Sequence, residues 1–227
     1  LAVRRICYLN ARHLILPKIG LGPMGCLCPG ALAVKKEKKK MFLFLANLFR
    51  WYSDVFFVFS SQADAIQSMA VKHNKKDFFI AAELPTIFSE IPVQKEKHIP
   101  TKIVYLSRIV PKKNLLFAIK ALAGVASPII FDVFGNIEDS AYWSQCLLES
   151  KKLPENIVFR YCGFANDPRM IFSDYDYFCF PTLSENYGYV VLESLSAGTP
   201  VLLSNTTYWN FLGSDDGCFV KSLDSLE

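Results

Sequence analysis

The chain has 227 residues, of which 52% are hydrophobic and 20% are charged, and its formal net charge at pH 7 is +4. This hydrophobic fraction excludes intrinsic disorder and predicts a sizeable core, in one large domain or two smaller ones. The small positive charge argues against a nucleic-acid-binding protein, which concentrates a stronger basic excess on one face, and is compatible with an anionic ligand or an anionic membrane surface.

The first hundred residues combine a basic and an aromatic segment. A lysine-rich run at 34–40 precedes the apolar stretch Met41–Phe59, which one amide and two charged side chains interrupt. Each charge near the middle of a bilayer costs about 2.5–3.5 kcal/mol. The pattern therefore favours a buried helix over 42–52 and a buried strand over 55–60, with a membrane span over 41–60 as the alternative. The lysine run fits either a solvated helix face or a contact with anionic lipid.

A helix start and a domain boundary follow. Ser61 and Asp64 have the spacing of a capping box, which predicts that a helix begins near them. The stretch Ser89–Lys102 is rich in proline, lysine and glutamate and is typical of a linker between domains. The sequence therefore predicts a partial first domain over residues 1–97 and a second domain over residues 98–227.

From residue 101 onward, short apolar runs alternate with amphipathic stretches, which predicts strands separated by helices. The strands are expected at Lys102–Leu106, Pro128–Phe134, Ile157–Tyr161, Tyr175–Phe180 and Val201–Ser204. The helices are expected at Asn114–Ala123, Glu138–Lys152, Pro168–Ser173 and Val190–Ala197, the last of them ended by Gly198. This order predicts a mostly parallel sheet with right-handed crossovers, whose ligands bind beyond the carboxyl ends of the strands.

Two glutamates eight residues apart, Glu185 and Glu193, lie on either side of a strand-to-helix turn. Gly188 stands at the start of the helix, where free N–H groups and the positive end of the dipole favour an anion such as a diphosphate. Glu193 is expected about two turns into that helix. A carboxylate can accept hydrogen bonds from two neighbouring hydroxyls of a ribose or a hexose. From the residues alone, two surface carboxylates beside an ordinary turn are an equal alternative.

A basic turn follows the first strand of this half of the chain. Arg108 and Lys113 lie across a proline-containing turn that opens a helix. Arginine can bind two phosphate oxygens at once, and lysine adds a mobile positive charge. A basic, solvated turn is the alternative for these two residues. Because a cationic turn and a helix start are both expected at the ligand-binding edge of the sheet, together they favour a bound sugar nucleotide.

Three segments, in this order along the chain, resemble the bacterial family 4 glycosyltransferases: SRIVPKKNLLFAIKAL, FDVFGNIEDSAYWSQC and FPTLSENYGYVVLESLSAGTPVLLSNTTYW. The resemblance extends from about residue 16 to the end. It implies an α/β protein of the GT-B type, with a Rossmann-like parallel sheet and flanking helices in the C-terminal domain and a partial second α/β domain. It further implies that a sugar is transferred, with retention, from a nucleoside-diphosphate donor to an acceptor hydroxyl in polysaccharide or lipopolysaccharide assembly.

The resemblance also implies a role for each candidate residue. Arg108 and Lys113 would hold the diphosphate and stabilise it as the leaving group. Glu185 would bind the transferred sugar and Glu193 the ribose. No metal or other cofactor is implied, because the cations and the helix start already neutralise the leaving diphosphate. The remaining donor-binding positions would be Gly163 near the base and, near the phosphate and sugar, the backbone of Asn186, Tyr187, Gly188, Tyr189 and Val190.

The expected partners are a UDP- or GDP-sugar and a glycan or lipid-linked acceptor, with no nucleic acid. Seven widely spaced cysteines argue against a secreted disulfide framework and against a zinc site, and therefore favour the cytoplasm. A peripheral contact with the anionic inner face of the plasma membrane is a further expectation. Both ends of the chain look cut, as expected of a fragment. A second hypothesis is a truncated, catalytically inactive remnant that binds a nucleotide or a partner protein.

Overall fold

The computed structural model describes residues 19–23, 26–27, 32, 36–49, 51–52, 55–60, 62–68, 78–81, 98–165, 167–185 and 187–223. The chain forms two compact units, Leu1–Leu84 and Pro85–Glu227. The domain bounds expected from the sequence, with a division between residues 97 and 98, stay a prediction.

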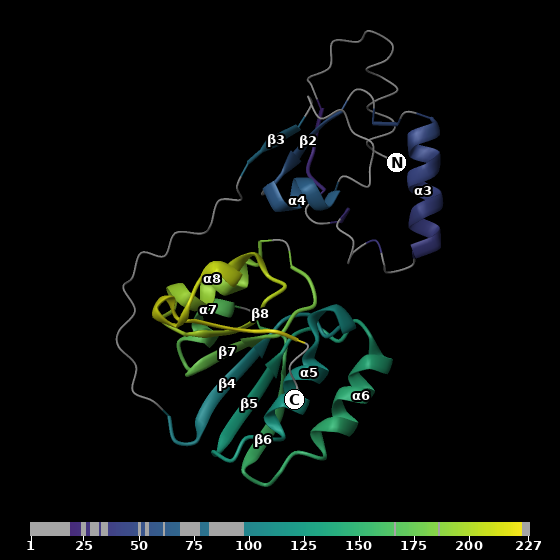
Figure 1. The fold of residues 1–227 in the computed structure, drawn as a ribbon. Helices are drawn as coiled ribbons and strands as arrows, with labels where there is room; N and C mark the ends of the chain where they lie inside the picture. Colours follow the sequence, from purple (N-terminus) through teal and green to yellow (C-terminus); the bar gives the residue numbers. More distant parts are fainter. Residues whose placement is uncertain are drawn as a thin grey trace. The chain divides into compact units, whose positions relative to one another are not determined.

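The second unit is built on a six-stranded parallel sheet with the strand order β6-β5-β4-β7-β8-β9 (Figure 1). The chain starts in the middle of the sheet, runs outward to one edge, returns to the middle at β7 and then runs outward to the other edge. The strands are β4 (Thr101–Leu106), β5 (Ile129–Phe134), β6 (Ile157–Gly163), β7 (Tyr177–Phe180), β8 (Val201–Ser204) and β9 (Cys218–Lys221).

Helices and short 3-10 turns connect these strands. They are η2 (Pro111–Lys113), α5 (Leu115–Leu122), α6 (Ser140–Ser150), α7 (Pro168–Phe172), α8 (Tyr189–Ser196), η3 (Tyr208–Phe211) and η4 (Ser214–Asp216). The expected alternation of strands and helices is confirmed, with β9 as an additional strand. β7 begins two residues later than expected because the N–H groups of Asp174 and Tyr175 close turns onto the end of α7. Gly198 has a φ of 71°, which confirms the left-handed end of α8.

The two faces of this sheet carry separate cores. Successive strand residues point to opposite faces, so Tyr105 of β4 packs in a cluster with α5 and α6, whereas Val104 packs in a cluster with α7 and α8. Both side chains are fully buried. Helices therefore cover the sheet on both sides, α5 and α6 on one face and α7 and α8 on the other (Figure 1).

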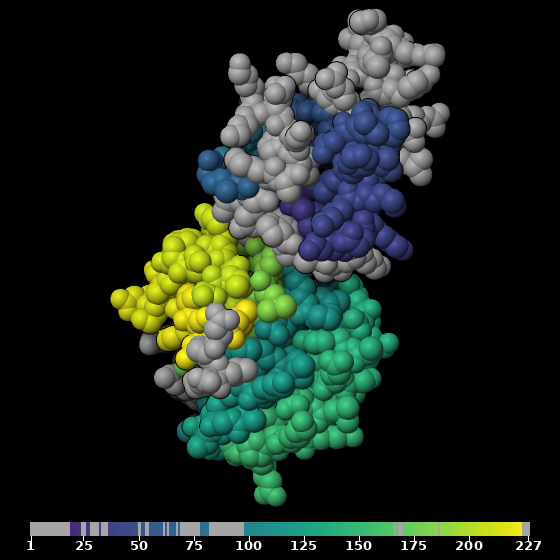
Figure 2. All heavy atoms as spheres, turned by 45° about the vertical axis from the view of Figure 1, so that its right-hand side comes forward, coloured from purple at the N-terminus to yellow at the C-terminus, as the bar shows by residue number. Residues whose placement is uncertain are grey.

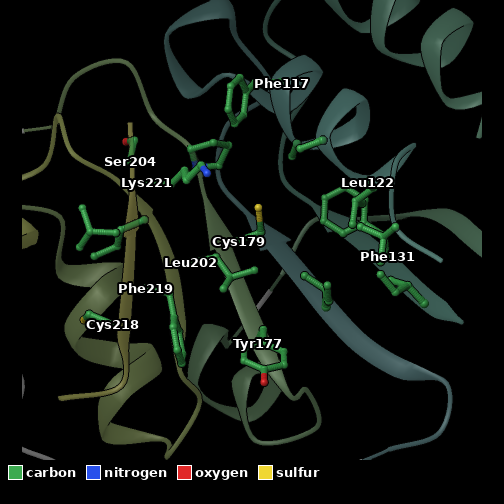
Figure 3. Close-up of a pocket in the computed structure, with 18 of the residues that line it drawn as sticks. Phe117, Leu122, Phe131, Tyr177, Cys179, Leu202, Ser204, Cys218, Phe219 and Lys221 are labelled. Atoms are coloured by element: carbon green, nitrogen blue, oxygen red, sulfur yellow. The ribbon is translucent and has the colours of Figure 1, made fainter. Parts of the chain in front are cut away.

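A cavity of about 850 Å³ lies on the face of the sheet that carries α5 (Figure 3). Phe117 and Leu122 of α5 line it, together with side chains of β7, β8 and β9 such as Tyr177, Leu202 and Phe219. Among the expected site residues that the structure describes, none lines this cavity.

The first unit contains a three-stranded parallel sheet of order β1-β2-β3. Its central strand alternates between buried and partly exposed side chains, with Phe57 and Phe59 in a small core, so the expected buried strand is confirmed. Asp64 accepts hydrogen bonds from the N–H and the hydroxyl of Ser60, whereas Ser61 lies outside the described residues. The elements are β1 (Ile19–Leu21), α3 (Lys36–Leu48), β2 (Val55–Phe59), α4 (Gln62–Gln67) and β3 (Phe78–Ile80).

The expectation of a buried helix over 42–52 is wrong. Helix α3, drawn in dark blue in Figure 2, begins earlier, at Lys36, and its apolar side chains are largely exposed. Met41, Phe44 and Leu48 are 62%, 66% and 61% exposed. Apolar residues occur on almost every side of this helix, so a single packing face cannot bury them all. No helix in the described part of the chain is long and apolar enough to cross a membrane.

Candidate functional site

The candidate site lies at the carboxyl ends of β4 and β7, the neighbouring strands between which the chain reverses its direction across the sheet. Such a switch point is where open parallel sheets bind ligands. The basic turn 107–113 follows β4, and the glutamate-bearing turn 181–188 follows β7. The two turns are joined directly, since the N–H of Leu183 donates a hydrogen bond of 2.9 Å to the carbonyl of Lys112.

Lys113 and Glu185 meet between these two turns. The side chains form an ion pair and are 11% and 17% exposed, respectively, and the ammonium lies 5.0 Å from the centre of the Phe180 ring. Burial lowers the pKa of Lys113 below its ordinary value, the charge and hydrogen bond of Glu185 oppose this effect, and the charges of Lys112 and Arg108 add to it. The structure thus brings two expected site residues into direct contact, a pairing that the sequence did not predict.

Local backbone geometry places Lys113 there. Pro111 opens the short η2 turn, and Asn114, with a φ of 58°, adopts the left-handed conformation between η2 and α5. Asparagine tolerates this conformation better than most residues. The hydroxyl of Tyr105 donates a hydrogen bond to the carbonyl of Lys113 at 3.3 Å, so a side chain of the buried strand β4 also holds this turn in place.

Arg108 lies on the same edge but makes a different contact. Its guanidinium pairs with Glu138 at 3.1 Å, and these side chains are 60% and 44% exposed. Gly135 brings the turn after β5 close enough for this pair. Its φ is +141°, and a Cβ atom there would lie 1.8 Å from the carbonyl oxygen of Ser107. Glu138 is a charged neighbour of the site that the sequence did not single out.

The start of α8 lies beside Glu185. Gly188 precedes the helix with a φ of 76°, and a Cβ atom there would lie 3.0 Å from Cγ of Glu185. Tyr189 and Val190 form the first turn, at the positive end of the helix dipole. Glu193 is partly buried and lies little more than one turn into the helix, not two, because α8 begins only at Tyr189. Asn186 is outside the described residues.

Gly163 ends β6 on the same side of the sheet, farther from the Lys113–Glu185 pair along the strand order. Its carbonyl accepts a hydrogen bond of 2.8 Å from the N–H of Gly135, which links the turns after β5 and β6. Its φ is +78° and a Cβ atom there would meet nothing within 4 Å, so open space adjoins this position.

A polar network supports β5 and β6 near this end of the sheet. Arg160 binds both carboxylate oxygens of Asp132 at 2.6 Å, and the hydroxyl of Tyr175 donates to the same carboxylate at 2.7 Å. Burial alone would raise the pKa of Asp132, but these hydrogen bonds and the charge of Arg160 lower it below its ordinary value. The carboxylate is therefore charged and fully paired, which suits a structural role.

The described residues contain no group of three or more histidine, cysteine, aspartate or glutamate side chains that could hold a metal ion. The two turns at this edge of the sheet offer a buried ammonium, a guanidinium, a helix start and a carboxylate. The first three favour negative charge, and the carboxylate accepts hydrogen bonds from hydroxyls.

Comparison with known proteins gives a consistent assignment. The family described as "Glycosyl transferases group 1" matches residues 87–210, which is more than half of the chain. The chain is 39% identical over 59 residues to the O-antigen biosynthesis glycosyltransferase WclY of Escherichia coli, covering 26% of this chain and 16% of that protein. It is 26% identical over 181 residues to poly(glycerol-phosphate) alpha-glucosyltransferase of Bacillus subtilis (strain 168), covering 77% of this chain and 25% of that protein.

Solved structures share the fold at low sequence identity. HepE of Anabaena, in complex with UDP and glucose, superposes with a TM-score of 0.72 at 15% identity, over 89% of this chain and 57% of that one. WaaG, a glycosyltransferase involved in lipopolysaccharide biosynthesis, gives a TM-score of 0.64 at 16% identity, over 95% of this chain and 66% of that one. The chain thus spans a quarter or less of the curated relatives and more than half of these two structures. The α/β architecture with parallel sheets and flanking helices is that of GT-B glycosyltransferases, and the chain belongs to the group 1 glycosyl transferases.

Proposed function

We propose that this chain binds the donor of a glycosyltransferase that moves a sugar, with retention, from a nucleoside diphosphate to an acceptor hydroxyl in bacterial polysaccharide or lipopolysaccharide assembly. The observation that carries this proposal is the meeting of Lys113, Glu185 and the start of α8 at the switch point of the sheet. A buried ammonium beside a helix start suits a diphosphate, and an adjoining carboxylate suits a sugar hydroxyl.

These residues bind different parts of the donor. Arg108 and Lys113 bind the diphosphate, and Glu185 binds the transferred sugar. When the bond between the anomeric carbon and the phosphate oxygen breaks, the electron pair leaves with the diphosphate. Positive charge already in place at that point stabilises the developing negative charge without reorganisation. Glu193 of α8 binds the ribose, and the turn at Gly163 borders the base.

The related proteins support the direction of this proposal. WclY is named for O-antigen biosynthesis and WaaG for lipopolysaccharide biosynthesis, and HepE has been solved with UDP and with UDP-glucose. We carry over to this chain a UDP- or GDP-sugar as donor and a glycan or lipid-linked molecule as acceptor. The five cysteines in the described part of the chain are free thiols, which supports a cytoplasmic location.

We also propose that α3 contacts an anionic membrane. Lys36, Lys38 and Lys40 are exposed at its beginning, and Phe42 and Phe44 are 49% and 66% exposed just beyond them. Basic residues near an anionic surface contribute about 1 kcal/mol each to binding, and exposed aromatic rings suit the headgroup region.

Calorimetric titration of the chain with UDP and with GDP tests the proposed donor site. We expect one of them to bind, and inorganic diphosphate and the corresponding nucleoside to bind more weakly than the intact nucleotide, because each occupies only part of the site. If neither nucleotide binds at millimolar concentration, the proposal is wrong. Binding without transfer to any supplied acceptor would favour the inactive, nucleotide-binding alternative.

A further inference from the structure

The turn that carries Glu185 is held by side chains from a distant part of the chain. The described residues of this turn, 181–185 and 187–188, contain no helix or strand, yet the candidate site depends on their position. Trp209 of η3 is 7% exposed, and its indole N–H donates a hydrogen bond of 2.6 Å to the carbonyl of Tyr187. The rings of these two residues also pack edge to face, with centroids 5.2 Å apart.

A second attachment holds the other end of the same turn. The hydroxyls of Ser204 and Thr206 each lie 2.6 Å from the carbonyl oxygen of Thr182 and donate to it. Both Ser204 and Thr182 are buried. Segment 204–209 therefore binds the backbone of the turn on both sides of Glu185.

Trp209 is also close to the point where the turn becomes helix α8. A Cβ atom on Gly188 would lie 3.0 Å from Cγ of Glu185 and 3.8 Å from the indole nitrogen of Trp209. Gly188 therefore lies close to both the indole of Trp209 and the side chain of Glu185. A shift of the Tyr187 carbonyl would move the start of α8 and the backbone of Glu185 together.

We infer that Trp209 is a positioning residue for the donor site, acting through the Tyr187 carbonyl on the start of α8 and on Glu185. This inference rests on the proposed function. The indole N–H carries the effect, because the part-buried carbonyl of Tyr187 would lose the hydrogen bond that Trp209 donates, and the turn must move to regain a donor.

The test compares Trp209→Phe with Trp143→Phe. Both changes replace indole by phenyl in the second unit, but Trp143 lies on α6 and packs against Tyr161 of β6, with centroids 4.9 Å apart. Affinity for UDP and GDP is measured by calorimetry, and amide hydrogen exchange is measured across the whole chain. We expect Trp209→Phe to weaken nucleotide binding about tenfold and to accelerate exchange at 187–191, with β5 unchanged. Trp143→Phe should match the wild type both in nucleotide affinity and in the exchange rates at 187–191.

Each other outcome is decisive. If Trp209→Phe binds the nucleotide as tightly as the wild type and keeps its exchange pattern, the positioning role is wrong while the proposed function stands. If the wild type binds neither nucleotide, the proposed function fails and this role fails with it. If exchange accelerates throughout the unit, including β5, or if the variant does not fold, Trp209 serves general stability and not the site. Thr206→Val, which removes one of the two hydroxyls at Thr182, should weaken binding less than Trp209→Phe does, and a larger effect would contradict the inference.

Discussion

Replacing Glu185 with glutamine should destabilise the second unit markedly, because Lys113 would then keep a positive charge in a nearly buried position without a counter-charge. Removing one partner of a fully buried ion pair costs about 3–5 kcal/mol. The Lys113 and Glu185 side chains retain 11% and 17% exposure, and glutamine still offers an acceptor oxygen. We therefore expect a smaller loss, about 2 kcal/mol in the free energy of unfolding.

The pH dependence of this loss provides an independent check. Burial already lowers the pKa of Lys113 below 10.5, and Glu185 opposes that effect, so the variant should have a still lower folded-state pKa. Between that pKa and 10.5, the unfolded variant binds more protons than the folded one, and this contribution to stability rises with pH. The difference in stability between variant and wild type should therefore narrow as the pH approaches 10.5.

Urea denaturation followed by tryptophan fluorescence measures both quantities, and Glu138→Gln is the matched control. This control removes the charge from an ion pair with Arg108 whose side chains are 60% and 44% exposed. Exposed pairs contribute about 0–1 kcal/mol, so Glu138→Gln should be nearly neutral. If Glu185→Gln costs no more than Glu138→Gln, the Lys113–Glu185 pair is not the buried interaction described above. A double-mutant cycle with Lys113→Met then isolates the energy of the pair itself.

Three further predictions concern ligand binding, a glycine and the helix α3. Lys113→Met should weaken the binding of UDP and of UDP-sugar alike, by about 10- to 150-fold for a charge-assisted hydrogen bond, whereas Glu185→Gln should weaken only the binding of UDP-sugar. Calorimetry with both ligands tests this, and an equal loss of UDP affinity in both variants would contradict the division of roles. Gly135→Ala should destabilise by more than about 2 kcal/mol because its Cβ atom would lie 1.8 Å from a carbonyl oxygen, whereas Gly124→Ala, with open space around it, should be nearly neutral in thermal unfolding. Binding of the chain to anionic vesicles should weaken steeply between 0.1 and 1 M salt, where the Debye length falls from about 10 Å to about 3 Å, and salt-insensitive binding would leave the lysines of α3 as a solvated face.

The fold of the second unit was largely predictable because its signals are local. Short apolar runs alternate with stretches whose apolar residues have helical spacing, and this pattern placed each expected strand and helix within two residues of its observed bounds. Gly198 ended α8 as expected, with a positive φ. The same reasoning failed for α3, where a high apolar content predicted burial, although the apolar residues do not gather on one side of the helix. Composition predicts that a segment is apolar, but only the arrangement around the helix axis decides whether it can be buried.

The candidate site was predictable only in part. Residues just after strands could be identified from the sequence because parallel sheets bring their carboxyl ends to one edge. The pairing of Lys113 with Glu185, and of Arg108 with Glu138, could not be identified. Both pairs depend on which strands are neighbours, and strand order has no local signal. A glycine directly after a strand, as at Gly135, is one signal of a close backbone contact, but the identity of the partner, Ser107, depends on the adjacency of β4 and β5.

The hydrogen bonds around the turn 181–188 show why a motif alone does not build a site. The two glutamates can be read from the sequence, yet the carbonyls of Thr182 and Tyr187 are bound by hydroxyl and indole groups that lie 22 to 24 residues further along the chain. An irregular turn lacks the repeated backbone bonds that hold a helix or strand, so these side chains replace them. The position of Glu185 relative to Lys113 therefore depends on the end of β8 and on η3 as much as on the motif itself. Substitutions at Trp209 should accordingly affect donor binding although the residue lies outside that motif.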